Sequence, residues 1–222
     1  MKHATAIVLG FGVLALTASY AAKRAADAVA TSDDADGSTA LDYVNVWGLI
    51  EQGVDTYSTE QAMRTNANLP AFLDAIMWSE GTAREADPYR VCYGYRHTIV
   101  SLADHPAVTG EWKGEDISKL GPQYVGKVST AAGAFQIIRA TWLGAKRALG
   151  LADFSAESQR AAATWLIKRR GALDDIERGD LQAAVDKCAA EWASLPGSTS
   201  GQPQRKFDQF ADAYSSAGGW LA

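Results

Sequence analysis

Four segments with helix-forming patterns, each followed by a glycine, constrain the fold of this chain more than any other feature. The expected helices cover residues 140–149, 155–170, 180–195 and 204–217. The glycines that follow them are Gly150, Gly171, Gly197 and Gly218. Glycine readily adopts the left-handed conformation in which many helices end, and Ser155 is a typical N-cap residue. We therefore predict a mainly α domain, which we expect to span residues 69–222.

The segment 88–129 has a different pattern, in which aromatic residues are mixed with glycines and other turn formers. Its aromatic residues include Tyr89, Tyr93, Tyr95 and Trp112. This pattern favours loops and short strands over helices. The expected fold is thus mainly α (α+β), with a helical lobe and a smaller irregular or β lobe.

The N-terminus contains an uncharged run, residues 4–22, between Lys2 and Lys23. Such a run is just long enough to cross a bilayer as a helix. Residues 1–22 are therefore expected to be a signal peptide or a weak signal-anchor segment. Cleavage after export, permanent anchoring and later release from the membrane all remain open. Each of these interpretations implies export from the cytoplasm.

Two segments separate this run from the domain. Residues 23–41 contain Ala, Asp, Ser, Thr and Gly but no aromatic residue, which is typical of a flexible acidic linker. Residues 42–68 are expected to form a connector. Within it, Ser58 and Gln61 have the spacing of a capping box that opens a short helix.

Charge and residue spacing exclude several kinds of site. The net charge is -5 and no basic cluster is visible, which argues against a nucleic-acid partner. The histidines His3, His97 and His105 form no HExxH motif, and no CxxC is present, so no metal site is expected. Cys92 and Cys188 could be bridged or free. We expect a monomer that needs no metal and no cofactor.

Glu80 stands at a position where an apolar residue is expected. Leu73, Ile76 and Met77 form an apolar stripe at helical spacing, and the next position of that stripe is Glu80. Gly81 follows at once and is expected to end the helix. Apolar surroundings and the negative end of the helix dipole both raise the pKa of a carboxyl group, which makes Glu80 a candidate proton donor. The alternative is a helix end whose last side chain reaches into water.

The segment STAAGAFQI at 129–137 is the second unusual stretch. Its small residues and Gly133 let a backbone approach a ligand closely. Gln136 then places an amide, which both donates and accepts hydrogen bonds, beside the apolar Phe135. Such a group suits sugar hydroxyl and acetamido groups, although a tight turn with a surface glutamine explains the pattern equally well.

Five separated motifs resemble the lambda-type phage endolysins. They are WSEGT at 78–82, DHP at 104–106, STAAGAFQI at 129–137, DFS at 153–155 and the long segment at 170–197. The resemblance implies a lysozyme-like fold and a lytic transglycosylase that cuts the glycan strands of bacterial peptidoglycan for host lysis. The N-terminal run resembles the signal-anchor-release segments of exported endolysins. It implies a protein at the inner membrane, held through residues 4–22, and in the periplasm of the host.

The resemblance also implies roles for individual residues. Glu80 matches the catalytic acid of the family. Gln136 and the turn at 104–106 are expected to border the substrate-binding cleft. Other residues are candidates for substrate binding because of their residue type. The expected substrate-binding residues are Gln136, Tyr95, His97, Asp104, His105 and Phe135.

The number of available carboxyl groups bears on the reaction. Hydrolysing glycosidases normally use two carboxyl groups, and no obvious second one is present, because Glu85 and Asp87 lie in a charged stretch. The resemblance implies that Glu80 alone protonates the bridging oxygen and then takes the proton of the muramoyl C6 hydroxyl, which gives a 1,6-anhydro product. A hydrolytic muramidase and a non-catalytic wall-binding or virion protein remain alternatives.

Overall fold

A long helix, α3, spans Thr56–Glu80 and carries the WSEGT motif at its C-terminal end. The computed structural model describes residues 56–222, with side chains from residue 67 onward. Phe72, Leu73 and Ile76 of this helix are buried, because its apolar positions recur at helical spacing. Pro70 lies inside the helix at an exposed position. The helix thus continues through residues 58–68, where the sequence predicted a separate short helix within a connector.

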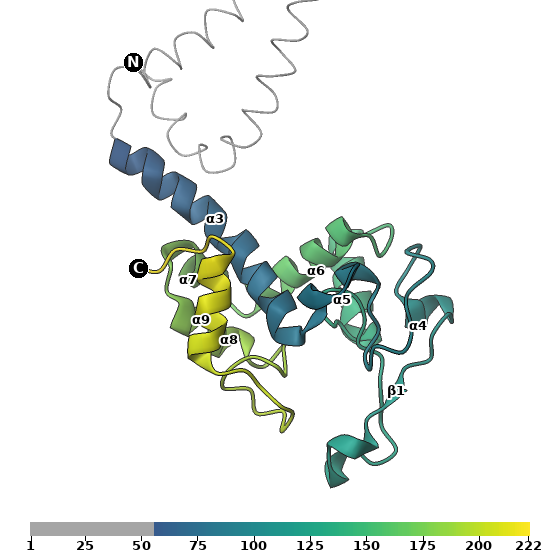
Figure 1. Ribbon diagram of the computed structural model, residues 1–222. Coiled ribbons are helices and arrows are strands. Elements are labelled where there is room, and N and C mark those ends of the chain that lie inside the picture. The colour runs from purple at the N-terminus through teal and green to yellow at the C-terminus, as the bar shows by residue number, and fades with distance from the viewer. Residues whose placement is uncertain (1–55) are drawn as a thin grey trace, which may run out of the picture. The chain divides into compact units, whose positions relative to one another are not determined.

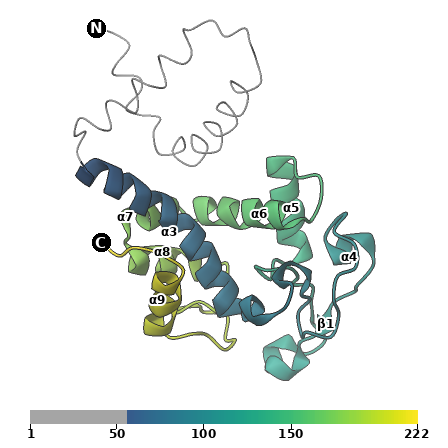
Figure 2. The same ribbon diagram turned by 45° about the horizontal axis from the view of Figure 1, so that its top comes forward.

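Five further helices form the helical lobe together with the last turns of α3. They are α5 (Arg139–Leu149), α6 (Ala156–Arg169), α7 (Leu173–Arg178), α8 (Leu181–Cys188) and α9 (Phe207–Ser216). Gly150, with φ of 66°, ends α5, and the Ser155 side chain caps α6 by accepting a hydrogen bond from the Ser158 backbone N–H. The helices predicted at 140–149 and 155–170 are therefore confirmed. Figures 1 and 2 show α5 and α9 on opposite sides of α3.

The helix predicted over 180–195 is shorter in the structure. It ends at Cys188, and the chain then turns through residues 189–196. In this turn Trp192 is buried and its indole Nε1 donates to the Phe135 carbonyl at 3.0 Å. Packing against other segments thus decides where the helix ends, which a local sequence pattern does not show. The short helix α7 was not predicted, and α9 begins three residues later than expected.

Residues 88–129 form a small lobe of loops and short elements, but most of these elements are short helices (η denotes a 3-10 helix), where the sequence favoured loops and short strands. The elements are η2 (Pro88–Arg90), α4 (Pro106–Thr109), β1 (Glu115–Asp116), η3 (Ser118–Leu120), η4 (Pro122–Tyr124) and β2 (Val128–Ser129). The two strands are antiparallel, with Glu115 opposite Ser129. An isolated bridge between Cys92 and Ala132 joins the lobe to the segment 129–137. Figure 2 shows α4 and β1 together, away from α7 and α8.

A continuous core of buried side chains connects the two lobes. Trp142 of α5 packs edge-on against Phe154, with ring centroids 4.7 Å apart. Phe154 in turn packs against His105, which precedes α4, at 5.0 Å. Such edge-to-face pairs are the preferred arrangement of aromatic rings. The small lobe is therefore fixed to the helical lobe by side-chain packing as well as by the chain.

The two cysteines are free and fully buried. Burial is the main reason that the pKa of each thiol is raised to about 12, and nearby carboxylates, Glu111 for Cys92 and Glu191 for Cys188, add to it. Both thiols are thus protonated and unreactive near neutral pH.

The expected signal segment and acidic linker, and the connector up to residue 55, lie outside the described residues. Within residues 56–222, no helix combines the length and apolar character that a membrane crossing requires. The chain divides near residue 66, and residues 67–222 form a compact unit that contains every side chain discussed below.

Candidate active site

Glu80 is the last residue of α3, and the next residue fixes the way in which the helix ends. Gly81 has φ of 83°, the left-handed conformation that the sequence predicted. The Tyr95 hydroxyl donates a hydrogen bond to the Glu80 carbonyl at 2.9 Å. A Cβ atom at Gly81 would lie only 2.8 Å from that hydroxyl oxygen. Glycine is therefore required here both for the backbone angle and for the approach of Tyr95.

The carboxyl group of Glu80 is half-buried and is held on one side. Ser194, in the turn after α8, donates from Oγ to Glu80 Oε1 at 2.7 Å. Ser79 in turn donates from its own Oγ to Ser194 Oγ at 3.0 Å, so two serines fix the orientation of the carboxyl group. No described residue forms a hydrogen bond to Oε2. One oxygen is thus positioned while the other stays available to a ligand.

The surroundings of Glu80 favour its protonated form. Desolvation by burial raises the pKa of Glu80 from 4.5 to about 7, against the lowering effects of the Ser194 hydrogen bond and the positive charge of Arg205. Arg205 lies next to the helix end, where its Nε donates to the Ser79 carbonyl at 3.2 Å and its guanidinium stacks 5.0 Å from the Trp78 ring. A carboxyl group with a pKa near 7 can both give and take a proton at neutral pH.

The segment 129–137 forms a wall that is attached to the end of α3. The Thr82 hydroxyl is buried and bridges the Ala134 carbonyl, at 2.6 Å, and the Met77 carbonyl, at 3.1 Å. Gln136 is half-buried with φ of 47°, and its Nε2 donates to the Gly133 carbonyl at 2.9 Å. No described residue donates to the Gln136 side-chain oxygen, which remains an available acceptor. Phe135 is only 1% exposed, so its side chain supports this wall from behind and does not line a cleft.

His105 lies in the structural core, and Asp104 beside it is partly buried and engaged by neighbouring side chains. Asp104 accepts hydrogen bonds from the Trp142 indole and the Lys146 ammonium, each at 2.7 Å. The His105 side chain has no exposed surface, and its Nε2 lies 3.0 Å from the Ile137 carbonyl. Burial lowers the pKa of His105 to about 4, so the ring is neutral. The side chains predicted to contact substrate here instead anchor the wall at 129–137 to α5 and α4.

Tyr95 and His97 have different environments, although both lie in the same turn of the small lobe. Tyr95 is 51% exposed and reaches the end of α3, as described above. His97 pairs with Glu111 at 2.8 Å, and Glu111 also accepts from the backbone N–H groups of Val100 and Ser101. The structure therefore brings Tyr95 to Glu80 and leaves His97 in a separate polar cluster.

The sequence missed two residues that the structure brings to Glu80, and it named a third, Tyr93, only among the aromatic residues of 88–129. Ser194 and Arg205 reach it from the turns after α8 and before α9, and the Arg205 backbone N–H donates to the Ser194 carbonyl at 2.8 Å. Tyr93 lies close enough for the Glu80 charge to add to the burial that raises its pKa. Ser194 lies inside the recognised motif at 170–197, but nothing in its local pattern marks it as a neighbour of Glu80.

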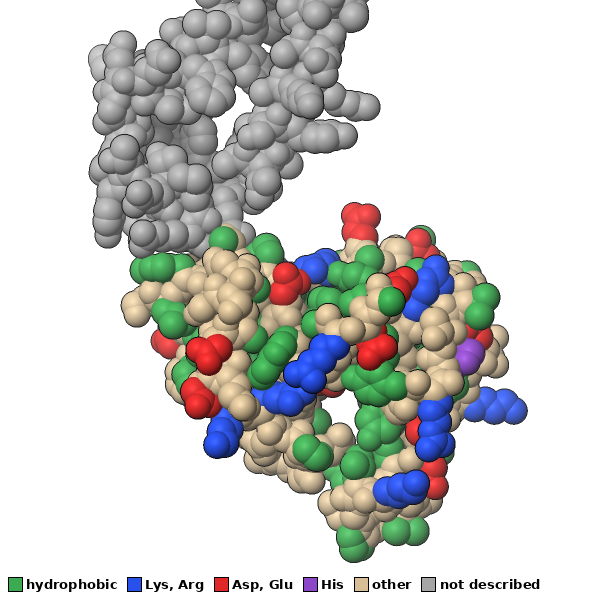
Figure 3. All heavy atoms as spheres, viewed as in Figure 1, with side chains coloured by type: hydrophobic (Ala, Val, Ile, Leu, Met, Phe, Trp, Pro, Cys, Tyr) green, Lys and Arg blue, Asp and Glu red, His purple; other side chains and the backbone are tan. Residues whose placement is uncertain are grey.

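The surface of the described residues is hollowed near the small lobe. Figure 3 shows the surface recessed between the small lobe and the loop that precedes α9. A hydrogen bond from the Tyr124 hydroxyl to the Ser200 carbonyl joins η4 to that loop. Within the described part of the chain, no group of three His, Cys, Asp or Glu side chains is arranged to hold a metal ion. The chemistry that these residues offer is proton transfer by one carboxyl group.

Comparison with known proteins gives consistent matches over the same residues. The family model described as Endolysin matches residues 70–221. The endolysin of Escherichia phage lambda is 38% identical over 159 residues, which are 69% of this chain and 93% of that protein. The endolysin of Escherichia phage P2 is 35% identical over 161 residues, which are 71% of this chain and 96% of that protein. The solved structure of bacteriophage lambda lysozyme complexed with a chitohexasaccharide superposes with a TM-score of 0.62 at 37% identity. It covers 70% of this chain and 97% of that chain.

Proposed function

The chain belongs to the endolysin family, and on that premise we propose that it cleaves the glycan strands of bacterial peptidoglycan by lytic transglycosylation. The bond cut is the one between N-acetylmuramic acid and N-acetylglucosamine. A glycan substrate is supported by the solved lambda lysozyme, which is complexed with a chitohexasaccharide. The observation that carries the proposal is the carboxyl group of Glu80, whose pKa is raised to about 7 and of which only Oε1 is held by a side chain of the described residues.

In the proposed reaction Glu80 acts first as acid and then as base. Its carboxyl proton passes to the bridging oxygen while the bond from that oxygen to C1 of the muramoyl residue breaks. The C6 hydroxyl oxygen of the same residue then bonds to C1, and its proton passes to the Glu80 carboxylate. The product is a 1,6-anhydro sugar, the acid is regenerated, and no water is consumed. A pKa near the working pH suits both steps.

Transglycosylation is favoured over hydrolysis by the charges near Glu80. A hydrolysing glycosidase normally needs a second carboxyl group across the bond. Among the described residues, the charged group that shifts the pKa of Glu80 is the cationic Arg205, and no carboxylate contributes. Glu85 is exposed, and Asp87 pairs with Arg90 at 3.2 Å. Glu115, whose charge, like that of Glu80, adds to the burial that raises the pKa of Tyr93, pairs with Arg96 at 3.2 Å. None of these three carboxylates shifts the pKa of Glu80.

Ser194 and Arg205 stabilise Glu80 in its ionised form, between the first and the second proton transfer. When Glu80 has given up its proton, the Ser194 hydrogen bond and the Arg205 charge both stabilise the carboxylate that remains. Burial acts in the opposite direction and favours return of the proton. The balance of these effects keeps both forms of Glu80 accessible.

We further propose that residues 4–22 carry the protein to the inner membrane and that the catalytic unit acts in the periplasm. This follows from the uncharged run alone. Fractionation of cells that express the full chain tests it, because recovery only in the cytosol would contradict export.

Product analysis tests the reaction directly. Purified sacculi are digested with the full chain, and the released muropeptides are identified by mass spectrometry. The proposal predicts ends with 1,6-anhydro-N-acetylmuramic acid. Reducing ends, which are heavier by one water, would instead identify a hydrolytic muramidase. Glycan binding without any release would indicate a non-catalytic wall-binding protein.

A further inference from the structure

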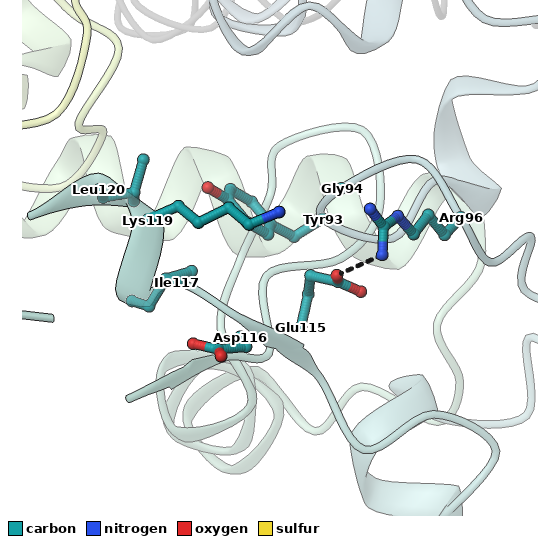
Figure 4. Close-up of a pocket in the computed structure, with 8 residues that line it drawn as sticks. All are labelled: Tyr93, Gly94, Arg96, Glu115, Asp116, Ile117, Lys119 and Leu120. Carbon is teal, nitrogen blue, oxygen red and sulfur yellow. Dashed lines mark ion pairs between the residues drawn. The ribbon is translucent and has the colours of Figure 1, made fainter. Parts of the chain in front are cut away.

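A pocket of about 370 Å³ in the small lobe has a lining that the cleavage of a neutral glycan does not require. Its lining residues are Tyr93, Gly94, Arg96, Glu115, Asp116, Ile117, Lys119 and Leu120 (Figure 4). Four of the eight are charged, two positively and two negatively. Sugars are usually bound by amides, hydroxyls and aromatic faces, as the glycan backbone here carries no free charge. The lining therefore suits a ligand that carries both carboxylates and an amine.

The pocket is attached to both sides of the active site. Tyr93 and Gly94 line it, and the next residue, Tyr95, donates its hydroxyl hydrogen bond to the Glu80 carbonyl. The Tyr93 backbone N–H donates to the Ala131 carbonyl at 2.9 Å, within the wall that carries Gln136. A ligand in the pocket would thus be an extension of a substrate that is held at Glu80.

Asp116 is held by hydrogen bonds from the Ser118 backbone N–H and hydroxyl, whereas Arg96, Glu115 and Lys119 are more loosely engaged. The pair between Arg96 Nη1 and Glu115 Oε1 is 3.2 Å long, and the Arg96 side chain is 74% exposed. The Glu115 side chain is 26% exposed, so solvent reaches both partners and weakens the pair, and a ligand can compete for either of them. In the described part of the chain, no side chain or carbonyl accepts a hydrogen bond from the Lys119 ammonium. Figure 4 shows Lys119 reaching across from η3 toward the turn that carries Gly94 and Arg96.

We propose that this pocket binds the peptide stem of the muramoyl residue whose bond is cleaved. The inference rests on the proposed function, because the stem is attached to the same sugar that Glu80 acts on. A stem of this kind is a short peptide with free carboxylates and, where its third residue is a diamino acid, a free amine. Lys119 and Arg96 bind its carboxylates, and Glu115 binds its amine. Ile117 and Leu120 contact the aliphatic parts.

Two substrates that differ only in the stem test the proposal. Soluble glycan strands are prepared with their stems, and a matched sample is stripped of stems by an amidase that cuts after the lactyl group. The full chain is expected to have a kcat/KM at least tenfold higher on the stem-bearing strands. In the double variant Arg96→Gln, Lys119→Gln this ratio is expected to fall close to one, mainly through a higher KM.

A second double variant controls for net charge. Lys113→Gln, Lys127→Gln removes two exposed cations of the same lobe that do not line the pocket. It should keep the wild-type ratio. Equal ratios for wild type and both double variants would overturn the proposal, as would an equal fall in both variants, which would indicate general charge attraction.

A binding measurement separates failure of this proposal from failure of the proposed function. If wild type cleaves neither substrate, the cleavage reaction is refuted, and the pocket is tested with the free tripeptide L-alanyl-D-glutamyl-diaminopimelate. Shifts of the Tyr93 and Lys119 NMR signals on titration with this tripeptide would support the pocket as a stem site. A titration with no shift at those residues would overturn it.

Discussion

The hydroxyl of Ser194 lies 2.7 Å from Oε1 of Glu80, although the two residues are 114 positions apart in the chain. This contact depends on the early end of α8, after which the chain turns and brings Ser194 to the end of α3. The hydrogen bond favours the charged carboxylate, while burial favours the neutral acid. The fold thus raises the pKa of Glu80 by burial and lowers it by the Ser194 hydrogen bond.

Ser194→Ala tests the contribution of this hydrogen bond. Its loss removes an influence that lowers the pKa of Glu80, so the alkaline limb of the activity profile should move to higher pH. Turnover at neutral pH should fall about tenfold, since the carboxyl group also loses its fixed orientation. Steady-state rates on sacculi from pH 5 to 9 measure both effects. Ser215→Ala, at an exposed position of α9, should leave the profile unchanged.

Arg205→Gln should also move the alkaline limb upward, because the charge that favours the Glu80 carboxylate is lost. Arg205→Lys keeps the charge and should retain most of the wild-type profile, although it loses the stacking on Trp78. The same pH series measures both variants. Identical profiles for Arg205→Gln and wild type would show that the guanidinium has no influence on the acid.

Gly81→Ala and Gly110→Ala form a matched pair. Both glycines have a positive φ, 83° and 82°, so alanine should cost about 1 kcal/mol of unfolding free energy at either position. A Cβ atom meets nothing within 4 Å at Gly110, whereas at Gly81 it displaces the Tyr95 hydroxyl. Urea unfolding should therefore give similar losses, but only Gly81→Ala should reduce glycan cleavage. Equal activity of the two variants would rule out a role for the Tyr95 contact.

Glu80→Gln should change the dependence of stability on pH. The folded pKa of Glu80, about 7, lies above the value of 4.5 expected in the unfolded chain. As pH rises from 4.5 to 7, the unfolded state loses its proton first, so wild-type stability falls, and above pH 7 the loss is complete. The difference amounts to about 3 kcal/mol for a shift of this size. Glu80→Gln should gain up to that much over wild type between pH 4 and pH 8, measured by urea unfolding. A gap between the two proteins that is constant with pH would contradict a raised pKa.

Much of the helical lobe and the position of Glu80 could be predicted from sequence, because they depend on local signals. Ser155 and Gly150 mark helix ends by their own chemistry, and Glu80 followed by Gly81 marks the end of α3. Ser194 could not be predicted as a partner of Glu80, since the contact exists only when distant segments pack together.

Histidine and acidic side chains were the least predictable part of the site. Histidine is a residue type often found in substrate clefts, but His105 is fully buried. Burial is tolerated because backbone groups form hydrogen bonds with both ring nitrogens. Asp104 is likewise occupied by Trp142 and Lys146. A motif records that such residues occur together. It does not distinguish those that face the ligand from those that hold the wall behind it.

The central claim is that Glu80 alone is the catalytic acid and that its pKa is raised to about 7. Titration of Glu80 tests this claim most directly. The protein is labelled with ¹³C at glutamate carboxyl groups, and the Glu80 signal is assigned by its loss in Glu80→Gln. We predict that this signal titrates with a pKa of about 7, well above the ordinary glutamate value of 4.5. A midpoint near the ordinary value of 4.5 would mean that Glu80 is ionised at working pH and would contradict its assignment as the proton donor.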